Sequence, residues 1–353
     1  MKQITNFLPN LKKNSVLSIL LAILIFTFTG CKSEKTLYLY CWTYYIPDSV
    51  VEQFEKEFNV DVKIDNYASN EEMFAKLKAG AKGYDVIFPS QDYASIMIKQ
   101  GMFHKIDNTQ FTNRHYVSEL VRSKATYDPD MEYAVPYYMG CSGVIVNKTK
   151  VPDYEKSWTI FERKDLANRM VMMDDMREVM GDALKYNGYS VNSLDPEALE
   201  KAAHTIAYDW KPNIVKFDAE SYAKGFASGD FWVVQGYAES IYEEIPEEKW
   251  DTIDFFVPKE GGTMYIDSMC IPKKSSHFDL AMQFINFIHR PQIYAMFCDE
   301  FSFPPSTNIK AGEYMTVEPL YTEEILNNCE IMDDLGENLA IYNKIWQEIR
   351  YTE

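Results

Sequence analysis

Short apolar runs alternate with amphipathic segments in the first part of the chain. The runs at 35–41, 60–64 and 84–88 have the composition and length of strands, and apolar residues recur at helical spacing between them. The order strand, helix, strand, helix, strand is typical of a parallel sheet with right-handed crossovers. The pattern therefore predicts an α/β fold, with mainly parallel sheets flanked by helices.

The two predicted helices in this region have recognisable starts. Asp48 is expected to cap the first helix, in which Val51, Phe54 and Phe58 fall on one face. Residues 69–72 read Ser-Asn-Glu-Glu, a capping-box pattern that begins the second helix. Both helices should bury one apolar face against the sheet.

The rest of the chain indicates a second structural unit. Runs at 134–138 and 143–146 look like strands that leave the first unit, and 264–272 looks like a strand that returns to it. A length of 353 residues also suits two lobes better than one core. We predict two lobes joined by crossing strands, with lobe 1 at 36–139 and 267–310 and lobe 2 at 140–266 and 311–353.

The first 30 residues resemble an export signal. Three lysines precede an apolar run at 16–28, which ends in Thr-Gly-Cys at Cys31. This ending resembles a bacterial lipobox, which predicts cleavage after residue 30, a lipid on Cys31 and a short tether at 31–36. An ordinary signal peptide and an N-terminal anchor helix are the alternatives. Each of them places the body of the protein outside the cytoplasmic membrane.

The charge balance disfavours some partners. The formal net charge is −18, and residues 1–30 contain three basic residues and no acidic one, so their removal would make the chain more acidic. Such a surface repels nucleic acid and attracts cations. We therefore expect no nucleic-acid partner.

Enzyme signatures are missing from the sequence. It has no metalloprotease, phosphate-loop, serine-hydrolase or dinucleotide motif, and the five histidines lack metal-ligand spacing. The six cysteines include no C-x-x-C pair, and five remain if Cys31 carries a lipid. We predict a non-enzymatic protein without cofactor, metal or structural disulfides. The sequence contains 25 tyrosines, so iron capture by a pair of tyrosines stays an open alternative.

An acidic turn lies between a predicted strand and a predicted helix at 171–180. Asp174 or Asp175 can cap the helix, and Asp175 and Glu178 would then share one face. We expect the positive end of the helix dipole to keep both carboxylates ionised, ready to receive an ammonium group. The alternative is that the segment is only a well-capped acidic helix start.

Further aromatic and acidic residues follow other predicted strands, where ligands of open α/β sheets bind. Carboxylates pair strongly with ammonium groups, and aromatic faces cover methylenes and attract cations. Together they favour a ligand with ammonium groups on an alkyl chain, although core packing is the alternative for each aromatic residue. The residues at these strand ends are Trp42, Tyr45, Ser90, Asp92, Tyr237, Tyr265 and Asp267.

Four segments, at 37–45, 84–90, 174–179 and 267–272, resemble the spermidine/putrescine-binding lipoproteins of bacterial ABC importers. The resemblance extends over about 36–350. It implies a two-lobed type II periplasmic-binding-protein fold with the ligand in the cleft between the lobes.

The resemblance also implies roles for individual residues. Asp175 and Glu178 would hold one terminal amine and Asp267 the secondary amine. Trp42, Tyr45, Tyr237 and Tyr265 would enclose the alkyl chain of the ligand, and Thr43 and Ser90 would supply hydrogen bonds. The sequence departs from the family pattern at Tyr44, Phe303 and Met332, all near the far amine. The predicted ligand-binding residues are Trp42, Thr43, Tyr44, Tyr45, Ser90, Asp92, Asp175, Glu178, Tyr237, Tyr265, Asp267 and Phe303.

The partners that follow are spermidine or putrescine, an ABC permease with its ATPase, and a membrane reached through the lipid at Cys31. We favour spermidine because Asp267, the acidic residue that the resemblance assigns to the middle amine, is present in this sequence. Two alternatives remain. One is a binding lipoprotein for another cation, such as iron or an amino compound, and the other is a surface lipoprotein that interacts with a protein.

Overall fold

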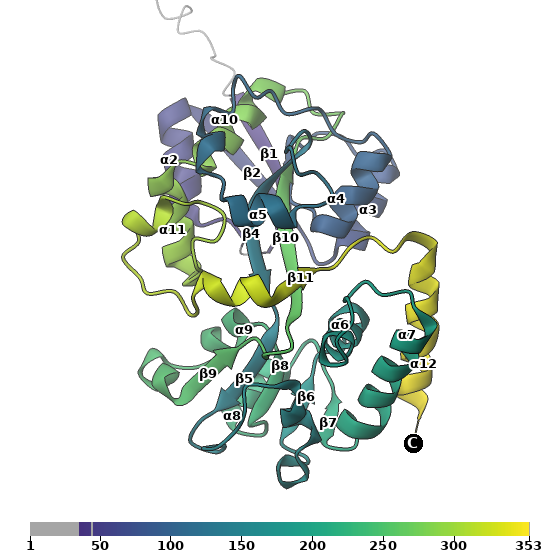
Figure 1. The fold of residues 1–353 in the computed structure, drawn as a ribbon. Helices are drawn as coiled ribbons and strands as arrows, with labels where there is room; N and C mark the ends of the chain where they lie inside the picture. Colours follow the sequence, from purple (N-terminus) through teal and green to yellow (C-terminus); the bar gives the residue numbers. More distant parts are fainter. Residues whose placement is uncertain (1–34, 44, 353) are drawn as a thin grey trace, which may run out of the picture.

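The computed structural model describes residues 35–43 and 45–352, so Cys31 and Tyr44 lie outside the described residues. Two β-sheets, each flanked by helices, stand one above the other in Figure 1. Strands β4 and β10 run from the upper sheet towards the lower one. The predicted α/β fold class is confirmed.

The first sheet has the order β11-β10-β3-β1-β2, and β4 pairs with β10. Strand β1 is parallel to β2 and β3, as the alternating pattern predicted, whereas β10 is antiparallel to β3 and β4. Its strands are β1 (Lys35–Trp42), β2 (Val60–Tyr67), β3 (Val86–Ile87), β4 (Ala134–Cys141), β10 (Gly262–Cys270) and β11 (Cys329–Ile331).

Helices cover both faces of this sheet (Figure 1). They are α2 (Asp48–Phe58), α3 (Asn70–Lys78), α4 (Gln91–Lys99), α5 (Glu119–Lys124), α10 (Phe278–Ile288) and α11 (Pro291–Phe301). The Ser69 cap of α3 is confirmed, because Ser69 Oγ accepts from the Glu72 amide at 3.2 Å, whereas the Glu72 carboxylate accepts from the Ala68 amide at 3.0 Å and not from that of Ser69.

The predicted start of α2 is wrong in detail. Pro47 occupies the cap position and Asp48 is the first helical residue, without a side-chain capping bond. The buried face also turns by one residue, because Val50 and Phe54 are fully buried while Val51 and Phe58 lie at its edge. Val50 and Phe54 are four residues apart, the spacing that stacks side chains on one helical face.

The second sheet has the order β7-β6-β8-β5-β9. Its strands are β5 (Gly143–Asn147), β6 (Met170–Met172), β7 (Ile214–Phe217), β8 (Val233–Gly236) and β9 (Ile253–Phe256). The associated helices are α6 (Met176–Tyr186), α7 (Pro196–His204), α8 (Tyr222–Ser228), α9 (Ala238–Glu243) and α12 (Leu339–Tyr351). A separate apolar core forms here around Trp158 and Trp210.

Three segments connect the two sheets. Strand β4 leads through Ser142 into β5, residues 257–261 lead from β9 into β10, and residues 332–338 lead from β11 to α12. Strand β11 pairs with β10 in the first sheet, whereas α12 packs on α6 and α7. The lobe boundaries given above remain a prediction.

Two further findings concern the residues that the structure describes. No helix among them is long and apolar enough to cross a membrane. The cysteines in these ranges are all buried free thiols, namely Cys41, Cys141, Cys270, Cys298 and Cys329.

Candidate functional site

A cleft of about 680 Å³ is lined by residues from both sheets. It brings together residues as far apart in the sequence as Trp42 and Leu339, which are 297 positions apart. Nine of the predicted residues line it: Trp42, Tyr45, Ser90, Asp92, Asp175, Glu178, Tyr237, Tyr265 and Asp267. Thr43 and Phe303 line an adjoining cavity of about 370 Å³, and Tyr44 lies outside the described residues.

The topology explains why these residues meet. Trp42 ends β1, and Ser90, Asp175 and Tyr237 occupy the cap positions of α4, α6 and α9, each one to three residues after the end of a strand. The carboxyl ends of strands and the amino ends of the following helices thus surround the cleft, which is the usual ligand position in α/β sheets.

Asp267, in β10 of the first sheet, is a buried carboxylate of the cleft, with 4% of its surface exposed. Ser90 Oγ donates to its Oδ1 at 2.6 Å, and the Tyr45 hydroxyl donates to its Oδ2. Burial raises the pKa of Asp267 to about 6, and these two hydrogen bonds oppose the rise. The side chain is therefore a fixed carboxylate that is mostly ionised at neutral pH.

Asp175 caps α6, as one of the two sequence alternatives predicted. Its Oδ1 accepts from the amides of Arg177 at 2.8 Å and Glu178 at 3.1 Å. The side chain is exposed at the mouth of the cleft. Helix capping accounts for one carboxylate oxygen, so the other is available to a ligand.

Glu178 is only 1% exposed. Its carboxylate accepts from Ser142 Oγ at 2.7 Å, from the Tyr237 hydroxyl at 3.0 Å, and from Thr263 Oγ1. Burial, followed by the charge of Asp175, raises the pKa of Glu178 to about 7. The expectation that the helix dipole keeps this carboxylate fully ionised is therefore wrong, because desolvation outweighs the dipole and the hydrogen bonds.

Asp92 adds another carboxyl group on the α4 side of the cleft. Its Oδ1 accepts from the Tyr93 amide at 2.9 Å. Burial raises the pKa of Asp92 to about 6, opposed chiefly by this hydrogen bond. A cation in the cleft would favour its ionised form.

Aromatic rings are held in fixed orientations around these carboxyl groups. Tyr237 and Tyr265 pack edge to face, with ring centroids 5.8 Å apart. Trp42 packs against Tyr67 at 4.7 Å, and Tyr45 against Tyr137 at 5.1 Å. Trp42, Tyr45, Tyr237 and Tyr265 are half-buried, so each exposes part of its surface to the cleft.

Sequence reasoning missed several residues of the cleft. Glu239 lies in its wall, only two residues after the predicted Tyr237 at the start of α9. Arg177 also lines it, but Asn192 Oδ1 at 2.7 Å and the Asp333 carbonyl at 3.3 Å engage its guanidinium. The position of Glu239 beside a predicted site residue was the available signal, whereas Ser142 and Thr263 gave none.

The cleft is rich in carboxylates, but the described part of the chain contains no cluster of three or more histidine, cysteine, aspartate or glutamate side chains placed to hold a metal ion. The combination of separated carboxylates and aromatic faces suits an elongated organic cation.

The sequence matches the family of bacterial extracellular solute-binding proteins over residues 49–318. It is 32% identical to the spermidine/putrescine-binding periplasmic protein of Salmonella typhimurium, over 90% of this chain and 92% of that one. It is 30% identical to a putrescine-binding periplasmic protein of Pseudomonas aeruginosa, over 89% and 88% of the two chains.

The TpPotD lipoprotein of Treponema pallidum has a similar structure, with a TM-score of 0.87 and 48% identity over 90% of this chain and all of that one. A spermidine/putrescine transporter binding protein of Streptococcus pneumoniae shares the fold, with a TM-score of 0.83 and 24% identity. These similarities confirm the resemblance carried by the four sequence segments. The chain therefore belongs to the bacterial extracellular solute-binding proteins, a family of transport components rather than enzymes, and groups with its spermidine/putrescine-binding members.

Proposed function

We propose that this protein captures a linear polyamine, spermidine in preference to putrescine, and delivers it to an ABC permease and its ATPase. The observation that carries the proposal is the cleft in which Asp267, Asp175 and Glu178 lie among half-buried aromatic rings. The names of the relatives, which state binding of spermidine or putrescine, support the same ligand class.

The proposed binding mode assigns one ligand group to each part of the cleft. Asp175 and Glu178 receive a terminal ammonium group, and Asp267 receives the secondary ammonium group. Trp42 and Tyr265 cover the methylenes between them. An ammonium group beside Glu178 also compensates for the desolvation that raises its pKa, because an opposite charge favours the ionised form.

The proposal includes a location outside the cytoplasmic membrane, with a lipid on Cys31 as the anchor. The sequence at 29–31 supports lipidation, although it lies outside the described residues. Mass spectrometry of the protein isolated from its native membrane tests the anchor. A mature N-terminus at Cys31 carrying acyl chains is expected, and an unmodified N-terminus elsewhere would contradict it.

Titration calorimetry with a ligand panel tests the binding function. Spermidine should bind one to one and more tightly than putrescine, whereas ferric iron and neutral amino acids should give no heat of binding. Binding of iron or an amino compound alone would favour the alternative cation carriers. Failure of every small molecule would favour a surface interaction protein and defeat the proposal.

Recovery of the ligand tests the absence of turnover. The described cleft offers carboxylates and rings, and we expect spermidine to be released chemically unchanged. Detection of an acetylated, oxidised or cleaved polyamine after incubation with pure protein would contradict a transport role.

A further inference from the structure

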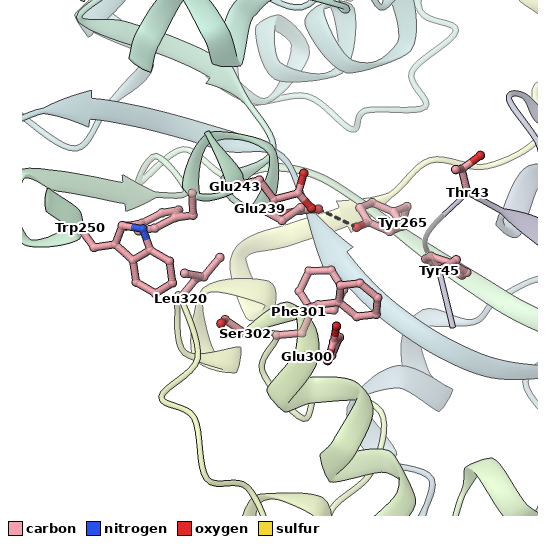
Figure 2. A pocket seen from close by; sticks show the side chains of 12 residues that line it. Thr43, Tyr45, Glu239, Glu243, Trp250, Tyr265, Glu300, Phe301, Ser302 and Leu320 are labelled. Carbon is pink, nitrogen blue, oxygen red and sulfur yellow. Dashed lines mark hydrogen bonds between the residues drawn. The ribbon is translucent and has the colours of Figure 1, made fainter. Parts of the chain in front are cut away.

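A second cavity of about 370 Å³, here called the side cavity, adjoins the cleft. Tyr45, Glu239 and Tyr265 line both spaces and form the junction between them. Figure 2 shows the Glu239 carboxylate beside the Tyr265 hydroxyl, with Trp250 and Leu320 further away from the cleft. The side cavity therefore continues the space past Tyr265.

Glu239 at this junction has an unused acceptor. Its Oε1 accepts a long hydrogen bond of 3.4 Å from Tyr265, whereas its Oε2 is buried and has no hydrogen-bond partner among the described residues. Buried polar atoms are normally paired, and an unpaired carboxylate oxygen is costly. Glu239 Oε2 can therefore accept a hydrogen bond from a donor that the described side chains do not supply.

The walls of the side cavity define the chemistry of that donor. Tyr242 and Trp250 pack edge to face with centroids 5.1 Å apart, and Phe301 adds another ring. Glu243 and Glu300 add carboxylates, and none of the described residues that line the cavity is basic. Rings and carboxylates without a competing cation suit an ammonium group at the end of an alkyl chain.

We propose that the side cavity extends the polyamine cleft and that Glu239 binds the second terminal ammonium group of the ligand. The ligand then extends from Asp175 and Glu178, past Asp267, to the junction at Glu239. This inference rests on the proposed function and assigns the far end of the ligand, which fixes the ligand length that the protein selects.

The experiment is a cycle of two proteins and three ligands. Wild type and Glu239→Gln are titrated with spermidine and with each of its two mono-N-acetylated forms. Acetylation removes the charge at one end of the ligand, and Gln removes the charge of the protein while keeping the acceptor for Tyr265. Glu244→Gln is the matched control, because Glu244 ends the same helix, is exposed and lines neither space.

Glu239→Gln should weaken spermidine binding by about tenfold or more, the range expected when one partner of a buried charge pair is lost. One acetylated form should bind wild type weakly and lose little further affinity in Glu239→Gln. The ratio of spermidine affinity to the affinity of this acetylated form should therefore be smaller in the variant than in wild type. Glu244→Gln should leave all affinities within about twofold of wild type, as for a rim charge.

The outcomes separate this inference from the proposed function. If wild type binds no polyamine, the proposed function fails. If wild type binds spermidine but Glu239→Gln binds it equally well, only the role of Glu239 is overturned. The same holds if acetylation at either end of the ligand costs as much affinity in the variant as in wild type. Melting curves check that the variants are folded.

A second variant tests the cavity without changing charge. Leu320→Trp should fill the side cavity from the loop that follows α11 and weaken spermidine by roughly fivefold or more, because the larger ring would occupy space that the ligand needs. Unchanged affinity in a folded Leu320→Trp protein would contradict an extended ligand even if Glu239→Gln could not be purified.

Discussion

Ser90 Oγ donates a 2.6 Å hydrogen bond to Asp267 Oδ1, although the two residues are 177 positions apart. Their backbones also form an isolated antiparallel bridge, and the Ser268 amide donates to the Pro89 carbonyl at 3.0 Å. The Tyr45 hydroxyl holds the other oxygen of Asp267. The orientation of this carboxylate is therefore set by the protein before any ligand enters, which reduces the entropy lost on binding.

The first prediction concerns the charge of Asp267. Asp267→Asn keeps the size of the side chain and removes its negative charge. Loss of one partner of a buried charge pair costs about 2–5 kcal/mol, so spermidine should bind roughly 30-fold more weakly or worse. Titration calorimetry of both proteins at one salt concentration measures this change.

Asp251→Asn provides the control for Asp267→Asn, since Asp251 is exposed and lines neither the cleft nor the side cavity. It should leave the affinity close to that of wild type. Equal affinities of Asp267→Asn and wild type, with both proteins folded, would remove Asp267 from the ligand contacts.

The second prediction separates the two roles of Asp175. Asn is also a good helix cap, so Asp175→Asn should leave the melting temperature nearly unchanged and weaken spermidine binding. Asp175→Ala removes the bonds to the amides of Arg177 and Glu178 and should in addition destabilise the protein by about 1 kcal/mol. If Asp175→Asn binds spermidine as wild type does, this residue is only a cap.

The third prediction is the pH dependence of Glu178. Burial raises its pKa in the folded protein to about 7, whereas the unfolded chain loses this proton near pH 4.3, about the ordinary value for glutamate. The folded ligand-free protein therefore binds the proton more tightly. The contribution of Glu178 to the free energy of unfolding therefore falls as the pH rises from about 4.5 to 7.

Glu178→Gln removes this cost, so the melting temperature of the variant relative to wild type should rise between pH 5 and pH 8. The affinity of wild type for spermidine should also increase from pH 5 to pH 8, because the ammonium group binds the ionised carboxylate more tightly than the protonated one. Melting curves and titrations at several pH values measure both trends. A pH-independent difference between the two proteins would show that Glu178 does not titrate in this range.

The fourth prediction concerns the core of the first sheet. His289 is fully buried between the rings of Phe111 and Tyr294, and burial lowers its pKa to about 3. Below about pH 6.5 the unfolded chain binds a proton that the folded protein does not, so this residue makes stability fall with falling pH.

Relative to His289→Phe, wild type should lose about 2 kcal/mol of unfolding free energy between pH 7 and pH 5, because the slope reaches about 1.4 kcal/mol per pH unit only below about pH 6.5. Denaturant titrations at the two pH values test this, with His204→Phe as the control for loss of an exposed histidine. Parallel pH profiles of wild type and His289→Phe would contradict it.

Local sequence patterns predicted much of the fold. Strand and helix alternation, the Ser69 cap and the Asp175 cap depend on residues close in sequence, and all appear in the structure. The start of α2 was misjudged because Pro47, with its fixed φ, takes the cap position that Asp48 was expected to occupy. The buried face of α2 then depends on the packing of Phe54 against α10 rather than on periodicity alone.

The electrostatics of the site could not be predicted in the same way. The burial of Glu178 depends on Ser142, between β4 and β5, and on Thr263, in β10. The unused oxygen of Glu239 likewise becomes evident only when Tyr265 and the side cavity are placed beside it. Desolvation is a property of the assembled site, so sequence spacing does not reveal it.

A crystal structure of the spermidine complex tests the central claim most directly. We predict one spermidine molecule in the cleft, with a terminal nitrogen within about 3 Å of a carboxylate oxygen of Asp175 or Glu178 and the secondary nitrogen at a similar distance from Asp267, as charge-assisted hydrogen bonds require. The methylenes should lie against Trp42 and Tyr265. Spermidine bound outside the cleft, or inside it with no nitrogen near Asp267, would contradict the account.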